Sequence, residues 1–257
     1  MNARVRALRA DAPTLAGHLR RREPVTDEAF DALLSEAAQL RSRSFWSSIR
    51  ACQHAADFFR EAGATRVLDV GSGVGKFASV LSLDSGHRVW GVEQRPALVY
   101  ESRLLAQQLA AEVVITEGGL EQIDPTRFDG FFCFNPFSEN ISEVRDCFDL
   151  TTTRSEEAYL RDVHVMERWL RAAPVGFALV TYNGLGGRIP VSFHAVRATD
   201  VNGDVLRLWV KQQPDDSSDA WLELEQMLVR ASGVEKAAKE ASSFTDRRLV
   251  RRLAAVP

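Results

Sequence analysis

The segment VLDVGSGVGK, residues 67–76, combines an apolar run, an acid and a glycine-rich turn. Asp69 is followed by Gly71, Gly73 and Gly75 at alternate positions. Glycine lets the backbone turn tightly and lets a ligand approach without meeting a Cβ, and the helix that follows offers free N–H donors at its start. The pattern predicts a ligand-binding loop between a strand and a helix.

Two familiar glycine loops do not fit this spacing. A dinucleotide-binding loop needs its last glycine where this chain has Lys76, and a phosphate-binding loop needs Ser or Thr where it has Phe77. The spacing therefore argues against a nicotinamide-dependent oxidoreductase, which ranks third among the functions that we consider.

The segment resembles motif I of the class I S-adenosylmethionine-dependent methyltransferases, in which an acid precedes Gly-x-Gly-x-Gly. In that family the second strand ends in an acid that holds both ribose hydroxyls, and Glu93 stands at that position here. A carboxylate suits the task because it can accept two hydrogen bonds at once. The resemblance implies S-adenosylmethionine as cofactor, with contacts from Asp69, Gly71, Ser72, Gly73, Glu93 and Gln94.

The third strand departs from the family pattern, which places an acid just after it to accept from the adenine amino group. One register puts Gly119 at that position, and another would use Glu117. The backbone N–H of Leu120 could still serve the ring, so we expect Gly119 and Leu120 to contact the cofactor.

The reaction site is expected where Asn135-Pro136-Phe137 ends the fourth strand. This run resembles the Asn-Pro-Pro-Tyr/Phe motif of amino-group methyltransferases with one proline missing. The resemblance makes Asn135 both the residue that orients the acceptor and a cofactor contact, with Phe137 as a wall of the pocket. Because a proline disfavours the helical conformation before it, we expect Asn135 to be extended. A simple strand-ending turn is the alternative.

The methyl acceptor is not identified by the sequence. An amino nitrogen of a small molecule fits the Asn-Pro-Phe run, while the glycine loop and Glu93 also resemble the Dot1-like protein-lysine methyltransferases. A cofactor-binding scaffold without catalysis is the alternative from another class.

Other chemistry-bearing residues are weaker candidates. Tyr182, in the glycine-containing segment 181–188, is expected to contact the substrate, and His164 and His194 are expected to be structural rather than catalytic. Cys133 is expected to be a buried strand residue, and no His/Cys/Asp/Glu set has metal-ligand spacing.

These residues need a sheet to bring them together. Short apolar runs alternate with helical segments, which predicts βαβ units and a parallel sheet covered on both faces. Asn202-Gly203 predicts a hairpin that closes it. The expected fold is α/β, a Rossmann-like doubly wound, mostly parallel seven-stranded sheet with a C-terminal antiparallel hairpin and N-terminal helices. The expected strands span residues 66–70, 88–92, 113–116, 128–134, 175–182, 191–198 and 205–210.

The chain is expected to divide into a basic extension and helical cover (1–62), a methyltransferase domain (63–212) and a helical tail (213–257). Thr26 can cap a helix carrying Phe30 to Ala37 on one face, and Gly63 can end a second helix. The first 22 residues hold six arginines and one acid, and we expect a frayed extension there rather than a transit peptide.

Composition sets the class of protein. The chain has 257 residues, 45% hydrophobic and 26% charged, with a net charge of -3 and three scattered cysteines. This balance predicts a soluble, cytoplasmic globular protein with neither membrane anchoring nor dedicated nucleic-acid binding. The tail, with an apolar stripe that starts at Trp221, could bind the core or a protein partner.

Overall fold

The computed structural model describes residues 11–142, 148, 152 and 154–215. The predicted helix of the C-terminal tail and the first ten residues lie outside the described residues. No helix of the described part is long and apolar enough to cross a membrane.

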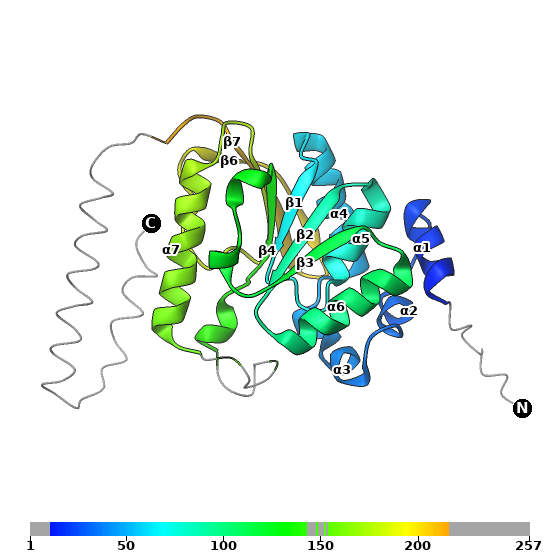
Figure 1. Ribbon diagram of the computed structural model, residues 1–257. Coiled ribbons are helices and arrows are strands. Elements are labelled where there is room, and N and C mark those ends of the chain that lie inside the picture. The colour runs from blue at the N-terminus through cyan, green and yellow to red at the C-terminus, as the bar shows by residue number, and fades with distance from the viewer. Residues whose placement is uncertain (1–10, 143–147, 149–151, 153, 216–257) are drawn as a thin grey trace, which may run out of the picture. The chain divides into compact units, whose positions relative to one another are not determined.

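A seven-stranded sheet forms the centre of the described chain, with strand order β3-β2-β1-β4-β5-β7-β6 (Figure 1). β1 to β5 are parallel, and β7 runs antiparallel to both of its neighbours. This confirms the predicted fold class. The strands are β1 (Arg66–Val70), β2 (Arg88–Glu93), β3 (Val113–Glu117), β4 (Gly130–Phe134), β5 (Ala178–Tyr182), β6 (Phe193–Val201) and β7 (Asp204–Lys211).

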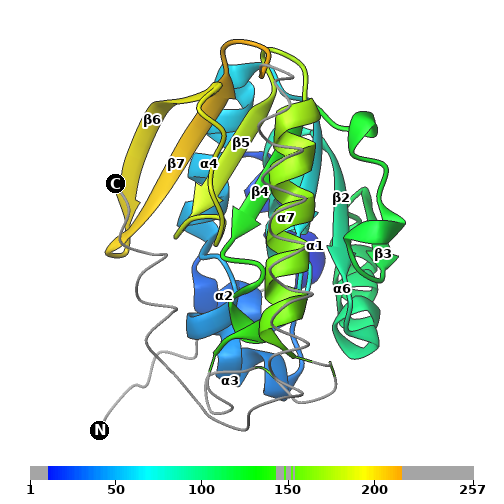
Figure 2. The ribbon, with the colours of Figure 1, turned by 90° about the vertical axis from the view of Figure 1, so that its left-hand side faces the viewer.

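Side chains alternate between the two faces of the sheet and build a separate core on each. Val67 of β1 packs into the core beneath α4 (Ile49–Ala62) and α5 (Lys76–Ser85), while Leu68 packs into the core beneath α7 (Glu156–Ala172). Figure 2 shows α7 in front of the sheet and α4 behind it. The two-sided burial explains why the central strands read as continuous apolar runs.

Capping residues mark the ends of the main helices, and Gly63 ends α4 as predicted. Ser48 and Ser155 cap α4 and α7 with their hydroxyl groups, and Pro96 is the first residue of α6 (Pro96–Leu109). Gly63 and Gly86 take left-handed conformations at the ends of α4 and α5. These boundaries depend on local backbone chemistry, which is why the sequence reveals them.

The predicted helix from Thr26 onward is broken into two. Thr26 caps α2 as predicted, but α2 (Asp27–Asp31) is short, and Ser35 caps a new helix, α3 (Glu36–Phe45). The Ser35 hydroxyl accepts from the N–H of Ala38 at 3.3 Å, which favours a fresh start at that residue.

The expectation of a frayed extension over the first 22 residues is wrong for α1 (Ala12–Arg20). Asp11 caps this helix by accepting from the N–H of Thr14 at 2.9 Å, and Leu15, Ala16 and Leu19 are buried. The apolar face of α1 packs against α5 and α6, so Arg20 lies at the end of a docked helix.

The hairpin is confirmed. Asn202 and Gly203, which join β6 to β7, have φ angles of 60° and 89°. Both values are positive, as a type I′ turn requires.

Candidate functional site

A cavity of about 420 Å³ lies where β1, β2 and β4 end. The strand order reverses between β1 and β4, and open α/β sheets bind ligands at this point. Figure 2 shows α2 and α3 at the end of the sheet toward which the arrow of β4 points. The cavity therefore has the sheet as its base and the N-terminal helices beside it.

Most of the predicted site residues meet at this cavity. Its lining includes Gly71 and Gly73 of the loop, Glu93 and Gln94 after β2, Gly119 and Leu120 after β3, and Asn135 and Phe137 after β4. Glu117, the alternative to Gly119, does not line it. The parallel strands bring together segments that are far apart in the sequence.

Gly73 allows a side chain of the N-terminal helices to approach the loop closely. Its φ is +53°, and a Cβ there would lie 2.5 Å from the indole of Trp46. Trp46 follows α3 and also lines the cavity, so this glycine lets the N-terminal helices approach the loop.

Glu93 joins the loop to the end of β2. Its side chain is 5% exposed; one carboxylate oxygen accepts from the N–H of Gly73 at 3.1 Å and the other from the N–H of Arg95 at 2.9 Å. Burial raises the pKa of Glu93, and these hydrogen bonds and the Arg95 charge partly offset the rise. Each oxygen has a second lone pair available to a ligand.

Arg95, Glu139 and Arg154 form a charged wall of the cavity. The guanidinium of Arg95 contacts the carboxylate of Glu139 and lies 3.6 Å from Glu93. Arg154 donates to the backbone carbonyls of Glu139 and Ser142, both at 3.3 Å. The sequence pattern gave no signal for this wall.

Helix α3 and the residues around it supply an aromatic wall that the sequence reasoning also missed. Phe45, Trp46 and Phe148 line the cavity, with ring centroids 5.6–5.8 Å apart. Arg41 lines it too, and its guanidinium lies 5.9 Å from the centre of the Phe45 ring. The i, i+4 spacing of Arg41 and Phe45 was the available signal.

Asp162 of α7 is another missed residue of the lining. Burial raises the pKa of this carboxyl, with Arg161 opposing the shift and Glu121 adding to it. Its helix was predicted, but nothing in the sequence indicated which face of that helix meets the cavity.

Asp69 does not line the cavity. It points to the α5 face of the sheet, is 3% exposed, and one of its oxygens has no hydrogen-bond partner among the described residues. Burial and the charge of Glu93 hold the pKa of Asp69 well above its usual range, and the backbone N–H of Ala78 partly opposes them. The sequence placed Asp69 near the loop correctly, but its side chain lies beneath the loop.

Ser72 and Tyr182 also fall outside the cavity. A Cβ on Gly91 would lie 2.6 Å from the Ser72 hydroxyl oxygen, so Ser72 points under the loop toward β2. Tyr182 is buried and donates to the carbonyl of Val201 at 3.0 Å. The strand alternation turns Tyr182 toward the α4 core, away from the cavity where the substrate contact was predicted.

Asn135 lines the cavity, but not with the extended backbone that was predicted. Its φ is +41°, in the left-handed region. Proline disfavours the right-handed helical region before it, and asparagine is one of the few side chains that enter the left-handed region readily. Ser138 donates to the Asn135 carbonyl through its N–H at 3.3 Å, which holds this turn.

The remaining candidates lie outside the cavity lining. His164 and His194 do not line the cavity. Cys133 is fully buried as predicted, and burial raises the pKa of its thiol. Among the described residues, no group of three or more His, Cys, Asp or Glu side chains could hold a metal ion.

No protein-family model matches the sequence, and no curated protein matches it. Solved structures do match. A "putative O-methyltransferase" from Klebsiella pneumoniae is 16% identical, with a TM-score of 0.53 over 77% of this chain and 96% of that one. An RNA methyltransferase from Salinibacter ruber in complex with S-adenosyl-L-homocysteine is 18% identical, with a TM-score of 0.47 over 66% of this chain and 94% of that one. The similarity to the Klebsiella protein shows that the chain has the Rossmann-like fold of class I methyltransferases.

Proposed function

We propose that this protein is an S-adenosylmethionine-dependent methyltransferase. The observation that carries the proposal is the hydrogen bond between Glu93 and the N–H of Gly73, on the wall of a cavity at the ends of β1 and β2. It brings the acid after the second strand beside the glycine loop, the arrangement that binds a nucleoside with an amino-acid tail. The fold and the matching solved structures support the same class.

The residues present fit such a cofactor. Glu93 can accept from two ribose hydroxyls through the lone pairs that Gly73 and Arg95 leave free. Leu120 begins a short 3₁₀ helix, so its N–H faces no partner within that helix and can serve the adenine ring. A cavity of about 420 Å³ is in the range that small-molecule sites occupy.

The bound cofactor would supply an electrophilic methyl group. The protein would then act mainly by positioning the acceptor and excluding water. Asn135 can accept a hydrogen bond from an amino group and direct its lone pair, and the buried ring of Phe137 closes one side of the cavity. A general base is needed only for an acceptor that arrives protonated.

We infer an amino nitrogen of a small molecule as the acceptor, because Asn135 is the polar residue that follows β4 directly into the cavity. A protein lysine is the alternative acceptor. A scaffold that binds the cofactor without turnover is the alternative of another class.

Isothermal titration calorimetry with S-adenosylmethionine, S-adenosylhomocysteine and NADH tests the proposal. We expect micromolar binding of the first two and none of NADH. Binding of neither adenosyl ligand would contradict the proposal. Binding without transfer of labelled methyl groups to any pool of small molecules or proteins would favour the scaffold.

Glu93→Ala is expected to weaken S-adenosylhomocysteine binding by about 1.5–3 kcal/mol, the size of a lost hydrogen bond to a charged group. Glu117→Ala is the matched control, because Glu117 ends β3 directly opposite Glu93 in the sheet register but does not line the cavity. Equal losses in the two variants would contradict the assigned role of Glu93.

A further inference from the structure

Four of the five backbone N–H groups of the glycine loop, residues 71–75, already have acceptors within the protein. Gly71 and Ser72 both donate to the carbonyl of Val92 at 3.0 Å, Gly73 donates to Glu93, and Gly75 donates to the carbonyl of Ser72 at 2.8 Å. A negatively charged ligand group lying on this loop cannot take these four donors without breaking existing bonds. A cationic side chain from another element could neutralise the charge of such a group without breaking these bonds.

Two of the arginines that line the cavity are committed to protein groups. Arg95 contacts Glu93 and Glu139, and Arg154 donates to backbone carbonyls of the segment after β4. Both hold the wall of the cavity in place, so neither has its charge free for a ligand.

Arg41 is different. It lines the cavity and lies over the ring of Phe45, yet it forms no ion pair or hydrogen bond with any residue that the structure describes. A guanidinium is always charged and binds a carboxylate through two parallel hydrogen bonds. Arg41 therefore offers an uncommitted cation inside the cavity.

Arg41 lies on the helix that ends beside the loop, and it lines the same cavity as Gly71 and Gly73. Trp46, at the end of α3, lies against Gly73, and Arg41 is on the same helix as the cavity-lining Phe45. The loop is where the amino-acid part of the proposed cofactor would lie, and that part ends in a carboxylate.

We propose that Arg41 binds the carboxylate of the cofactor's amino-acid part, so that the N-terminal cover completes the cofactor site. This inference rests on the proposed function. It means that the binding site is split between the methyltransferase sheet, which supplies Glu93, and the cover, which supplies the opposite charge.

The test compares S-adenosylhomocysteine with its decarboxylated analogue, which keeps the ammonium and lacks only the carboxylate. We expect the wild-type protein to prefer the intact ligand by about 10- to 100-fold, the worth of a charge-assisted hydrogen bond. In Arg41→Gln the preference should fall to about twofold or less, while binding of the analogue stays close to wild type. Arg41→Lys should keep part of the preference.

Arg50→Gln is the matched control, because Arg50 is exposed on α4 and does not line the cavity. It should keep the wild-type preference. A preference that survives in Arg41→Gln, or equal losses for both ligands in that variant, would overturn the inference while leaving the proposed function intact. A wild-type protein that binds neither ligand would overturn both.

Discussion

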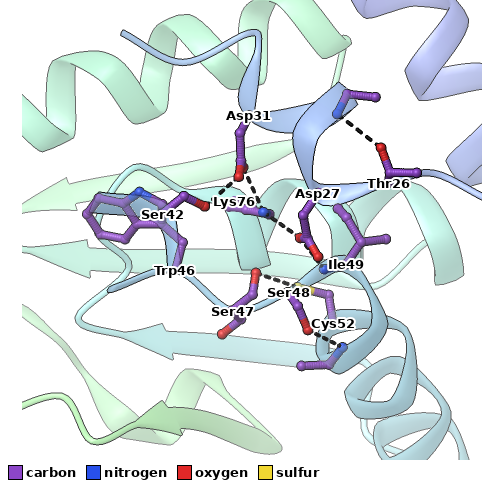
Figure 3. A network of polar contacts seen from close by, with 12 residues as sticks. Thr26, Asp27, Asp31, Ser42, Trp46, Ser47, Ser48, Ile49, Cys52 and Lys76 are labelled. Carbon is purple, nitrogen blue, oxygen red and sulfur yellow. Dashed lines mark hydrogen bonds and ion pairs between the residues drawn. The ribbon is translucent and has the colours of Figure 1, made fainter. Parts of the chain in front are cut away.

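Two buried ionisable residues flank the glycine loop in the sequence, Asp69 before it and Lys76 after it. They differ in how many polar partners the fold provides. Lys76, at the start of α5, is 2% exposed, and its ammonium lies 2.7 Å from a carboxylate oxygen of Asp27 and 2.7 Å from one of Asp31 (Figure 3). Asp69, at the end of β1, is also buried, yet one of its oxygens has no partner among the described residues.

The Lys76 cluster is a joint between elements. Asp27 also accepts from the N–H of Ile49 at 2.8 Å, and Asp31 accepts from the hydroxyl of Ser42 at 2.5 Å. The cluster thus ties α2 to α3, α4 and α5, as Figure 3 shows. Burial acts to lower the pKa of Lys76, but the two aspartates outweigh it and raise that pKa.

Lys76 and Asp69 lie close together in the sequence, but the contacts of Lys76 point to a structural role and those of Asp69 to a role at the candidate site. A buried charge is costly unless it is paired, and the buried ammonium of Lys76 contacts two carboxylates. On the Asp69 side, a buried acid lies near the second buried acid, Glu93, beneath the cavity. A buried acid with a strongly raised pKa beside a cavity is typical of a ligand site.

The largest effect is expected from Lys76→Met, which leaves Asp27 and Asp31 without their cation. Removing one partner of a buried ion pair costs about 3–5 kcal/mol. We expect the free energy of unfolding, measured with urea, to fall by about 3 kcal/mol, because Asp27 is partly exposed and can be rehydrated.

Two further variants sharpen this result. Arg50→Met, at an exposed position, should change the free energy of unfolding by less than about 0.5 kcal/mol. Combining Lys76→Met with Asp27→Asn and Asp31→Asn should recover part of the loss, because the unpaired charges are then gone. If Lys76→Met unfolds no more easily than Arg50→Met, the cluster is not the joint that the contacts indicate.

The sequence predicted roles that depend on neighbouring residues, but not contacts between elements far apart in the chain. Thr26 caps α2 through its hydroxyl group, and Gly63, Gly71 and Asn202 act through their own backbone, so these roles follow from local chemistry. The pairing of Lys76 with α2 joins residues 45 and more positions apart and carries no local pattern. For the same reason, Glu93 at a strand end was predictable, while the contribution of α3 to the cavity was not.

The second-largest effect is the contribution of the buried Asp69 carboxyl to the pH dependence of the free energy of unfolding. Because the pKa of Asp69 is raised in the folded state above its ordinary value of 3.8, the folded protein keeps a proton that the unfolded chain has released. The free energy of unfolding should therefore fall as pH rises from about 4 toward the folded-state pKa, by up to about 1.4 kcal/mol per pH unit.

Asp69→Asn should remove this contribution, so that its unfolding free energy falls less steeply with pH than that of the wild type. Urea titrations at several values between pH 4 and pH 7 measure the slope. Glu117→Gln, at an exposed acid on the end of β3, should keep the wild-type slope. Parallel curves for Asp69→Asn and the wild type would show that the buried carboxyl does not stay protonated.

The smallest effect concerns Tyr182, which the sequence analysis assigned to the substrate site and the structure places in the core. Tyr182 was expected at the substrate, but it packs in the α4 core and its hydroxyl is bonded to the Val201 carbonyl. Tyr182→Phe should therefore lower the free energy of unfolding by about 1 kcal/mol, the worth of one hydrogen bond, and leave S-adenosylhomocysteine affinity unchanged. Tyr182 would then be a structural residue like Lys76, because the polar groups of both have their partners inside the fold. An unchanged stability together with weakened ligand binding or methyl transfer would instead move Tyr182 to the site, and would mean that β5 turns its last side chain toward the cavity when a ligand is bound.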